Sequence, residues 1–178
     1  MPPTMVGRQF TPALRGARLP TLLLALQQMT PMHSPFKTSW RVRFDEVDLQ
    51  GVVHHSQIVT YLEIARLEYW RSLGISYRQM REDGHEFIVY RLNVEYIKPL
   101  LFDEIITVAV RVKSLSRASF VLGYEIFKEV EDPERSRKDA LAVTADIELV
   151  CARNNIPKPV ALPPDYREKL RREMNPYA

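Results

Sequence analysis

The sequence predicts one α+β domain in which a single antiparallel sheet wraps one long, buried helix. Three observations lead to this fold class. A strand-like segment precedes the only long helical segment with a wide apolar stripe, and four more strand-like segments follow it. The connections between those strands are short, which suits antiparallel hairpins rather than parallel crossovers. A helix with one apolar stripe buries that stripe against one face of such a sheet.

The first strand is predicted from about Thr38. Trp40, Val42 and Phe44 alternate there with two arginines. A period of two in apolar residues indicates a strand with one buried face.

The helix is predicted from about residue 57 to residue 73, with Ser56 as its N-cap and Gly74 after its last turn. Its apolar residues recur at helical spacing. They are Ile58, Tyr61, Leu62, Ala65, Tyr69 and Leu73. Two pairs spaced three residues apart, Glu63 with Arg66 and Glu68 with Arg71, are expected to form ion pairs on the helix surface.

The four later strands are each predicted from apolar residues at every second position. Their apolar rows are Ile88, Tyr90, Leu92, Val94 and Tyr96; Ile106, Val108, Val110 and Val112; Phe120, Leu122, Tyr124 and Ile126; and Leu141, Val143, Ala145, Ile147, Leu149 and Cys151. Polar or proline-bearing breaks separate the rows at 98–104, 114–117 and 129–139. Pro163 and Pro164 are expected to start a short, charged terminal helix.

Residues 1–31 read as an N-terminal extension, and residues 32–178 as the domain. The extension carries three arginines, five prolines and no acid. An Arg-rich, acid-poor segment is typical of a targeting peptide. The alternative is that translation starts at Met32, which gives a domain without the extension.

Composition excludes several classes of protein. Residues 32–178 carry 22 bases and 22 acids, so the domain has no basic excess for nucleic acid. No apolar run approaches the roughly 20 residues of a membrane-spanning helix. The single cysteine, Cys151, forms no internal disulfide, which favours a reducing compartment. We therefore expect a cytoplasmic protein, or an organellar one if the extension is a targeting peptide.

Polar side chains are densest in residues 43–57, between the first strand and the helix. Three acids, a glycine and two histidines precede a helix whose free N–H groups and positive dipole end favour negative charge. That end could stabilise charge on a carbonyl oxygen, while a carboxylate acts on water or on the carbonyl carbon. These groups suit ester or thioester cleavage. A period of two predicts that Glu46 and Asp48 share one side of the chain and that Asp45 lies on the other.

The same segment carries a family motif. Phe-x-x-x-Asp-x-x-Gly-Val-Val-x-His runs from Phe44 to His55, and it continues into Tyr61-Leu62-Glu63 and Ala65-Arg66-x-Glu68. It resembles the active-site signature of hotdog-fold thioesterases of the 4-hydroxybenzoyl-CoA thioesterase-like branch, particularly the acyl-CoA thioesterases associated with the Tol-Pal system. The resemblance extends from about residue 38 to residue 165, and includes Val94-Glu95-Tyr96, Pro99 and the stretch from Pro157 to Pro163.

The resemblance implies a hotdog fold and an acyl-CoA thioesterase that needs no metal and no organic cofactor. It assigns catalysis to Asp48, as nucleophile or general base, with assistance from His55. Backbone N–H groups around His55 and Ser56 would polarise the thioester carbonyl. Arg117 matches the basic turn that meets the phosphates of coenzyme A. A single sheet wrapped around one helix leaves a long open edge and an incomplete acyl tunnel, so we also expect a homodimer or homotetramer with sites between subunits.

Several alternatives stay open. Glu63 is a second candidate for the catalytic acid, and Lys98 and Lys113 are weaker candidates than Arg117 for phosphate binding. His54 is expected to have a structural role or to face solvent. Asp48, His54, His55 and His85 do not form a closed metal-ligand set, because adjacent histidines on an extended segment point apart. A non-catalytic acyl-CoA or acyl-carrier-protein binding module and a hotdog dehydratase are the alternative functions, and the acyl group is not specified.

Overall fold

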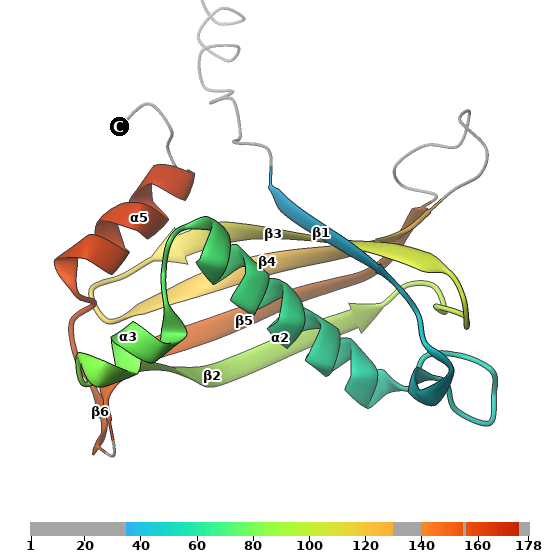
Figure 1. Cartoon of the computed structure of the whole chain (residues 1–178), viewed down its shortest axis with the longest axis horizontal. Helices are drawn as coiled ribbons and strands as arrows, with labels where there is room; N and C mark the ends of the chain where they lie inside the picture. The colour runs from blue at the N-terminus through green and yellow to red at the C-terminus, as the bar shows by residue number, and fades with distance from the viewer. Residues whose placement is uncertain (1–34, 130–139, 155, 175–178) are drawn as a thin grey trace, which may run out of the picture. The chain divides into compact units, whose positions relative to one another are not determined.

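The computed structural model describes residues 35–129, 140–154 and 156–174. Its elements are β1 (Phe36–Arg41), the 3-10 turn η1 (Phe44–Glu46), α2 (His55–Ser72), α3 (Tyr77–Glu82), β2 (His85–Tyr96), β3 (Ile105–Leu115), β4 (Ser119–Lys128), β5 (Leu141–Arg153), β6 (Ile156–Pro159) and α5 (Pro164–Met174) (Figure 1). The predicted extension at 1–31 and most of the predicted break at 129–139 lie outside these residues.

The strands form one antiparallel sheet in the order β1-β3-β4-β5-β2, and β6 pairs with the outer end of β5. α2 crosses one face of this sheet (Figure 1). The predicted α+β class, with an antiparallel sheet around one long helix, is confirmed. β1 and β2 are the two edges of the path, so each has one side without a partner strand in the described chain.

The apolar stripe of α2 explains why the helix lies on the sheet. Tyr61, Leu62 and Ala65 are fully buried, and Tyr69 nearly so. They pack against the inward rows of β3, β4 and β5, which alternate as predicted except at the start of β5, where a register shift leaves Leu141 out of the inward row and Ala142 is buried. Each large side chain buried in this way contributes roughly 1.5–3 kcal/mol. The two predicted ion pairs of α2, Glu63 with Arg66 and Glu68 with Arg71, are also present.

β2 departs from the simple alternation that the sequence predicts. The register with β5 shifts between Val89 and Arg91, so Tyr90 occupies a bulge. Before the bulge Val89 pairs with the buried Leu149, and after it Leu92 pairs with the buried Ile147. The inward row therefore changes parity at Tyr90, and Ile88 does not belong to the same face as Leu92. A bulge inserts one extra residue, which no strict period of two can reproduce.

The first strand is shorter than predicted. β1 ends at Arg41, and a 3-10 turn replaces the extended chain at Phe44–Glu46. Val42 is buried as expected, but the side chain of Phe44 is 78% exposed. Phe44 packs instead on the exposed ring of Phe102, with ring centroids 5.9 Å apart.

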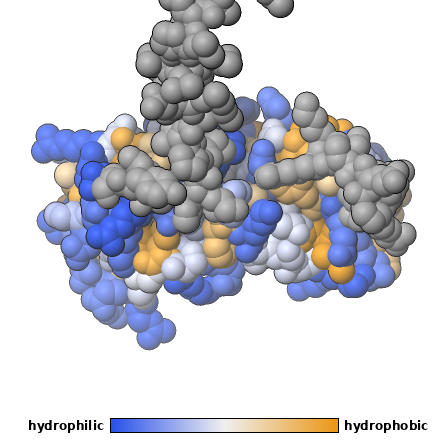
Figure 2. Space-filling view, turned by 90° about the horizontal axis from the view of Figure 1, so that it is seen from above, coloured by the Kyte–Doolittle hydropathy of each residue, from blue (hydrophilic) through white to orange (hydrophobic). Residues whose placement is uncertain are grey.

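One end of the sheet is packed by elements that the sequence analysis missed or predicted only in part. α3 and β6 were not predicted, whereas α5 confirms the expected terminal helix. Phe120 makes edge-to-face contacts there with Trp70 and Phe87, whose own rings are tilted to each other, and Tyr166 of α5 packs edge-to-face on Phe87. Figure 2, seen from above, shows that hydrophilic side chains predominate at the left-hand end, where the charged α5 lies. No helix of the described residues is long and apolar enough to span a membrane.

Candidate active site

The polar segment before α2 folds into a closed loop. Val47 and Val53 form an antiparallel bridge at its base, and the Asp48 N–H donates to the Val52 carbonyl at 2.9 Å. The Gly51 N–H donates back to the Asp48 carbonyl at 2.9 Å. Gly51 has a φ of +77°, a left-handed conformation that glycine adopts without strain. The loop therefore holds Asp48 directly before the start of the helix.

Asp48 is half-buried, and it serves the loop as well as any chemistry. Its Oδ1 accepts the Gln50 N–H at 2.8 Å, which is the turn that aspartate commonly makes with its own backbone. No hydrogen bond or ion pair within the described part of the chain joins Asp48 to His55. The second carboxylate oxygen has no recorded partner among these residues, so one oxygen is free to act on a ligand.

The helix begins two residues earlier than predicted, and its N-cap is His54 rather than Ser56. The His54 Nδ1 atom accepts the Ser56 N–H at 3.4 Å and lies 2.7 Å from the Ser56 hydroxyl. The His54 carbonyl accepts the Gln57 N–H at 2.8 Å. Imidazole replaces the expected hydroxyl because the chain is still extended at His54, where a cap must lie. The structural role expected for His54 is thus found.

His55 is the first helical residue, and its side chain is exposed. Its ring lies on the His54 ring, with centroids 4.1 Å apart. Its backbone N–H has no hydrogen-bond partner among the residues that the structure describes. The first N–H groups of a helix lack intrahelical acceptors and carry the positive end of its dipole. The start of α2 therefore presents a donor to an anionic or polarised oxygen.

Glu46 does not lie beside Asp48 as the period of two predicts. The 3-10 turn rotates its side chain inward, where it is 5% exposed. Its carboxylate accepts the Arg43 N–H at 2.7 Å, the Arg43 Nε at 3.1 Å and the Tyr61 hydroxyl at 2.6 Å. Burial and then the bond to Glu46 raise the pKa of Tyr61 above its ordinary value. Tyr61 was predicted only as part of the apolar stripe of the helix, and nothing in the sequence indicated that its hydroxyl bonds Glu46.

An apolar groove opens beside the loop and the helix start. It has a volume of about 280 Å³. Its lining residues are Val52, Val53, Ile58, Tyr96, Ile97, Lys98, Pro99, Leu100 and Val143. Val52 also accepts the Asp48 N–H, and the Tyr96 hydroxyl donates to the His55 carbonyl at 3.5 Å. The groove thus adjoins both ends of the segment that carries the predicted chemistry.

Arg117 lies at the other end of the sheet. Its hairpin joins β3 to β4, where Ala118 accepts the Cys151 N–H and Arg117 accepts the Leu162 N–H. The Asp48 loop instead contacts residues 100–101, just beyond the end of β2. These two levels are separated by most of β2, roughly 30 Å at 3.3 Å per residue. In one chain Asp48 lies in the loop that leads into α2, where His55 and Ser56 lie, whereas the Arg117 hairpin between β3 and β4 lies at the other end of the sheet. Figure 1 shows the β3–β4 hairpin and the start of α2 at opposite ends of the sheet.

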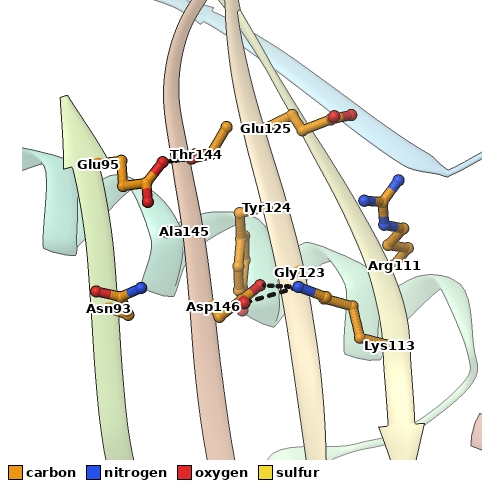
Figure 3. Close-up of a pocket in the computed structure, with 10 residues that line it drawn as sticks. All are labelled: Asn93, Glu95, Arg111, Lys113, Gly123, Tyr124, Glu125, Thr144, Ala145 and Asp146. Atoms are coloured by element: carbon orange, nitrogen blue, oxygen red, sulfur yellow. Dashed lines mark hydrogen bonds and ion pairs between the residues drawn. The ribbon is translucent and has the colours of Figure 1, made fainter. Parts of the chain in front are cut away.

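The weaker candidates lie away from the loop or have other partners. Glu63 is exposed and pairs with Arg66 at 3.5 Å. Lys113 belongs to a polar hollow of about 230 Å³ on the sheet face turned away from α2 (Figure 3). It crosses Gly123 to reach Asp146 at 2.7 Å, and a Cβ at position 123 would lie 2.6 Å from its Cδ. Lys98 lines the apolar groove.

No group of three or more histidine, cysteine, aspartate or glutamate side chains in the described part of the chain could hold a metal ion. His85 lies at the start of β2, at the end of the sheet opposite the Asp48 loop. It therefore cannot share a metal site with His54 and His55 in this chain.

Comparisons with known proteins identify relatives of this chain. A family model described as "Thioesterase superfamily" matches residues 50–133, so the match starts two residues after Asp48. A candidate esterase of Aquifex aeolicus is 43% identical over 95 residues, which cover 53% of this chain and 74% of that protein. The acyl-CoA thioester hydrolase YbgC of Escherichia coli is 27% identical over 128 residues, which cover 72% of this chain and 90% of YbgC.

A solved structure is also similar to this chain. The DHNA-CoA thioesterase of Staphylococcus aureus is 34% identical, with a TM-score of 0.67. The alignment covers 76% of this chain and 88% of that one. The fold and the sequence thus match the same group of proteins.

Proposed function

This chain belongs to the thioesterase superfamily and is a thioester hydrolase, and we propose that it cleaves an acyl-CoA to a carboxylic acid and free coenzyme A. The observation that carries the proposal is the closed loop that holds the Asp48 carboxylate before the N-terminus of α2, beside an apolar groove. A carboxylate, an N–H donor and an apolar surface are the three elements that hydrolysis of an acyl thioester uses.

In the proposed reaction the thioester carbonyl oxygen accepts the His55 N–H. That donor and the helix dipole stabilise the negative charge that forms on the oxygen. Asp48 then acts in one of two ways. It attacks the carbonyl carbon, expels the coenzyme A thiolate and forms an anhydride that water hydrolyses, or it takes a proton from water as the water attacks. The leaving thiolate takes up a proton in either case. His55 assists at the thioester, and the chain needs no metal or organic cofactor for these steps.

The acyl group is proposed to lie in the apolar groove, with its carbonyl toward the start of α2. Tyr96 at the end of β2 lines the groove. Further back along β2, Val89 is 45% exposed and Leu92 is 37% exposed although both belong to the inward row. α2 does not cover this row. A second copy that pairs along the β2 edge would cover it and close the groove, since an unpaired edge strand is a ready site for pairing.

The same arrangement accounts for Arg117. Two β2 strands related by a two-fold axis run antiparallel, so the start of one lies beside the end of the other. The Arg117 hairpin lies near the start of β2 and the Asp48 loop near its end. We therefore infer a homodimer, or a tetramer built from it, in which Arg117 of the second copy approaches the phosphates of a coenzyme A bound at the Asp48 loop. An acyl carrier protein is the alternative donor of the acyl group, and the cytoplasm is the proposed compartment.

Thiol release from a panel of acyl-CoAs tests the hydrolysis directly. The wild-type protein is expected to release thiol from at least one of them, and Asp48→Asn is expected to lower kcat by roughly 10²–10⁴-fold. Asp45→Asn is the matched control, because Asp45 lies three residues earlier, in the 3-10 turn, and its side chain is exposed. Equal loss in the two variants would contradict the role of Asp48. Binding without thiol release from any member would favour a non-catalytic binding module.

Light scattering tests the assembly. We expect a dimer or tetramer, and we expect Leu92→Lys to shift it toward monomer with loss of activity, because an inward charge on an edge strand blocks pairing. Ile156→Lys is the control, since Ile156 is 52% exposed on β6 and lies away from the β2 edge. A fully active monomer would overturn the in-trans site.

A further inference from the structure

A buried carboxylate lies at the base of the Asp48 loop and takes no part in the reaction proposed above. Glu46 is the one polar or charged side chain that is buried among the described residues. Its three donors, two from Arg43 and one from Tyr61, satisfy it. Replacing a buried ion pair by apolar side chains is often neutral for stability or stabilising. Stability alone therefore does not explain why a carboxylate is placed here.

Glu46 links both ends of the loop to α2. Its carboxylate accepts the hydroxyl of Tyr61, which lies in the second turn of the helix. Its backbone carbonyl accepts the N–H of the N-cap His54 at 2.9 Å. The next residue, Val47, pairs with Val53 and closes the loop. Asp48 thus projects from a loop whose base is bonded to the helix at two separate points.

The Tyr61 side chain is itself fixed. It is fully buried, and the indole of Trp40 packs edge-on against its ring with centroids 5.4 Å apart. A ring held in this way can move its hydroxyl only if β1 or α2 moves. The 2.6 Å bond to Glu46 therefore transmits the position of the helix to the loop.

We propose that Glu46 and Tyr61 are a positioning pair that holds the Asp48 carboxylate in register with the N–H donor at the start of α2. The inference rests on the role proposed above for Asp48. Neither side chain touches the substrate. Their effect is on the geometry of the transition state, where a displacement of about 1 Å can cost roughly 100-fold in rate. Loss of the pair should lower kcat more than it raises KM.

Steady-state kinetics of Tyr61→Phe and Glu46→Gln, with rates expressed per folded protein, test the pair. Each variant is expected to lower kcat by roughly 10- to 100-fold and to change KM by less than about threefold. The kcat of the double variant should be at most about threefold below that of the slower single variant, because the two residues act through one bond.

Tyr69→Phe is the matched control. Tyr69 is also buried on α2 and its hydroxyl also donates to a carboxylate, that of Glu173 at 3.4 Å, but it lies two turns further from the loop. Its kcat should equal that of the wild type. An equal fall in kcat in Tyr61→Phe and Tyr69→Phe would overturn the positioning role, and so would a wild-type kcat in both single variants of the pair. An active Asp48→Asn would instead contradict the proposed function, and the two failures are therefore distinct.

Discussion

The two ends of the sheet are built for different purposes. At the end that carries the Arg117 hairpin, α3, β6 and α5 cover the sheet, and the rings of Trp70, Phe87 and Phe120 pack against one another. At the other end the loop before α2 leaves Phe44 78% exposed and Leu49 fully exposed. The first end places apolar side chains where they stabilise the fold. The second places a carboxylate, a helix start and apolar side chains where a ligand can reach them.

The difference shows that the residues that stabilise the fold gather at one end of the strands, and the candidate active-site residues at the other. A site needs groups that are only partly desolvated, and these add little to folding. The covered end can then supply the free energy that the open end does not. Each of the following predictions probes this division.

The largest effect is expected at the covered end. Trp70→Ala should lower the free energy of unfolding by about 3–5 kcal/mol, because Trp70 is 2% exposed and its removal leaves a cavity among Phe87 and Phe120. Leu49→Ala should change it by less than about 0.5 kcal/mol. Urea denaturation measures both. A cost at Leu49 comparable with that at Trp70 would show that the open end also carries the fold.

A smaller effect is expected where the open end contacts the core. Tyr61→Phe should cost about 1.5–3 kcal/mol, the range for a hydrogen bond to a charged group, because Glu46 loses one of its donors. Tyr124→Phe is the control. Its hydroxyl is buried without a recorded partner among the described residues, so its removal should be neutral or slightly stabilising. A greater loss in Tyr124→Phe would contradict this assignment.

Much of this division is readable in the sequence. The predicted apolar rows of β3 and β4, and that of β5 from Val143 onward, are buried at every second position, and the stripe of α2 repeats at helical spacing. Their burial follows from periodicity alone. The closed loop at Asp48 and Gly51 and the helix that starts at His55 both fall within the polar segment 43–57 that the sequence singles out, because that segment is continuous in sequence. The catalytic roles of Asp48 and His55 stay predictions.

The features that were missed depend on local breaks in periodicity. Tyr90 occupies a bulge that changes which face of β2 points inward. Glu46 is turned inward by a 3-10 turn rather than by a strand, and its partner Tyr61 is 15 residues away. His54 caps α2 although Ser56 is the better capping residue by type. In each case tertiary contacts determine the local backbone conformation. That conformation, rather than the residue type, then determines which side chain is buried or caps the helix.

Alkaline pH should weaken the protein through its buried tyrosines. Burial is the main cause that raises the pKa values of Tyr61, Tyr69 and Tyr124 in the folded protein. In the unfolded chain tyrosine titrates near 10. The stability that the neutral hydroxyls contribute is complete below about pH 10 and is lost as the pH rises further, at about 1.4 kcal/mol per pH unit for one tyrosine. Denaturation at pH 9 and 11 should show a shallower loss in Tyr124→Phe than in the wild type, and an unchanged loss would contradict the burial effect.

The smallest expected effect would connect the two ends through the second copy. Arg117→Ala should raise KM for an acyl-CoA by roughly tenfold, about 1.4 kcal/mol, and leave kcat unchanged, because a phosphate contact far from the carbonyl contributes only uniform binding. The N-acetylcysteamine thioester of the same acyl group has no phosphate, so its KM should not change. Arg78→Ala on α3 is the control, since this arginine is exposed on the same end of the domain as the Arg117 hairpin.

In a mixture of Arg117→Ala and Asp48→Asn chains, the heterodimer has one site with both residues intact only if they come from different subunits. Recovery of wild-type KM in that mixture is therefore expected, and its absence would place the phosphates elsewhere.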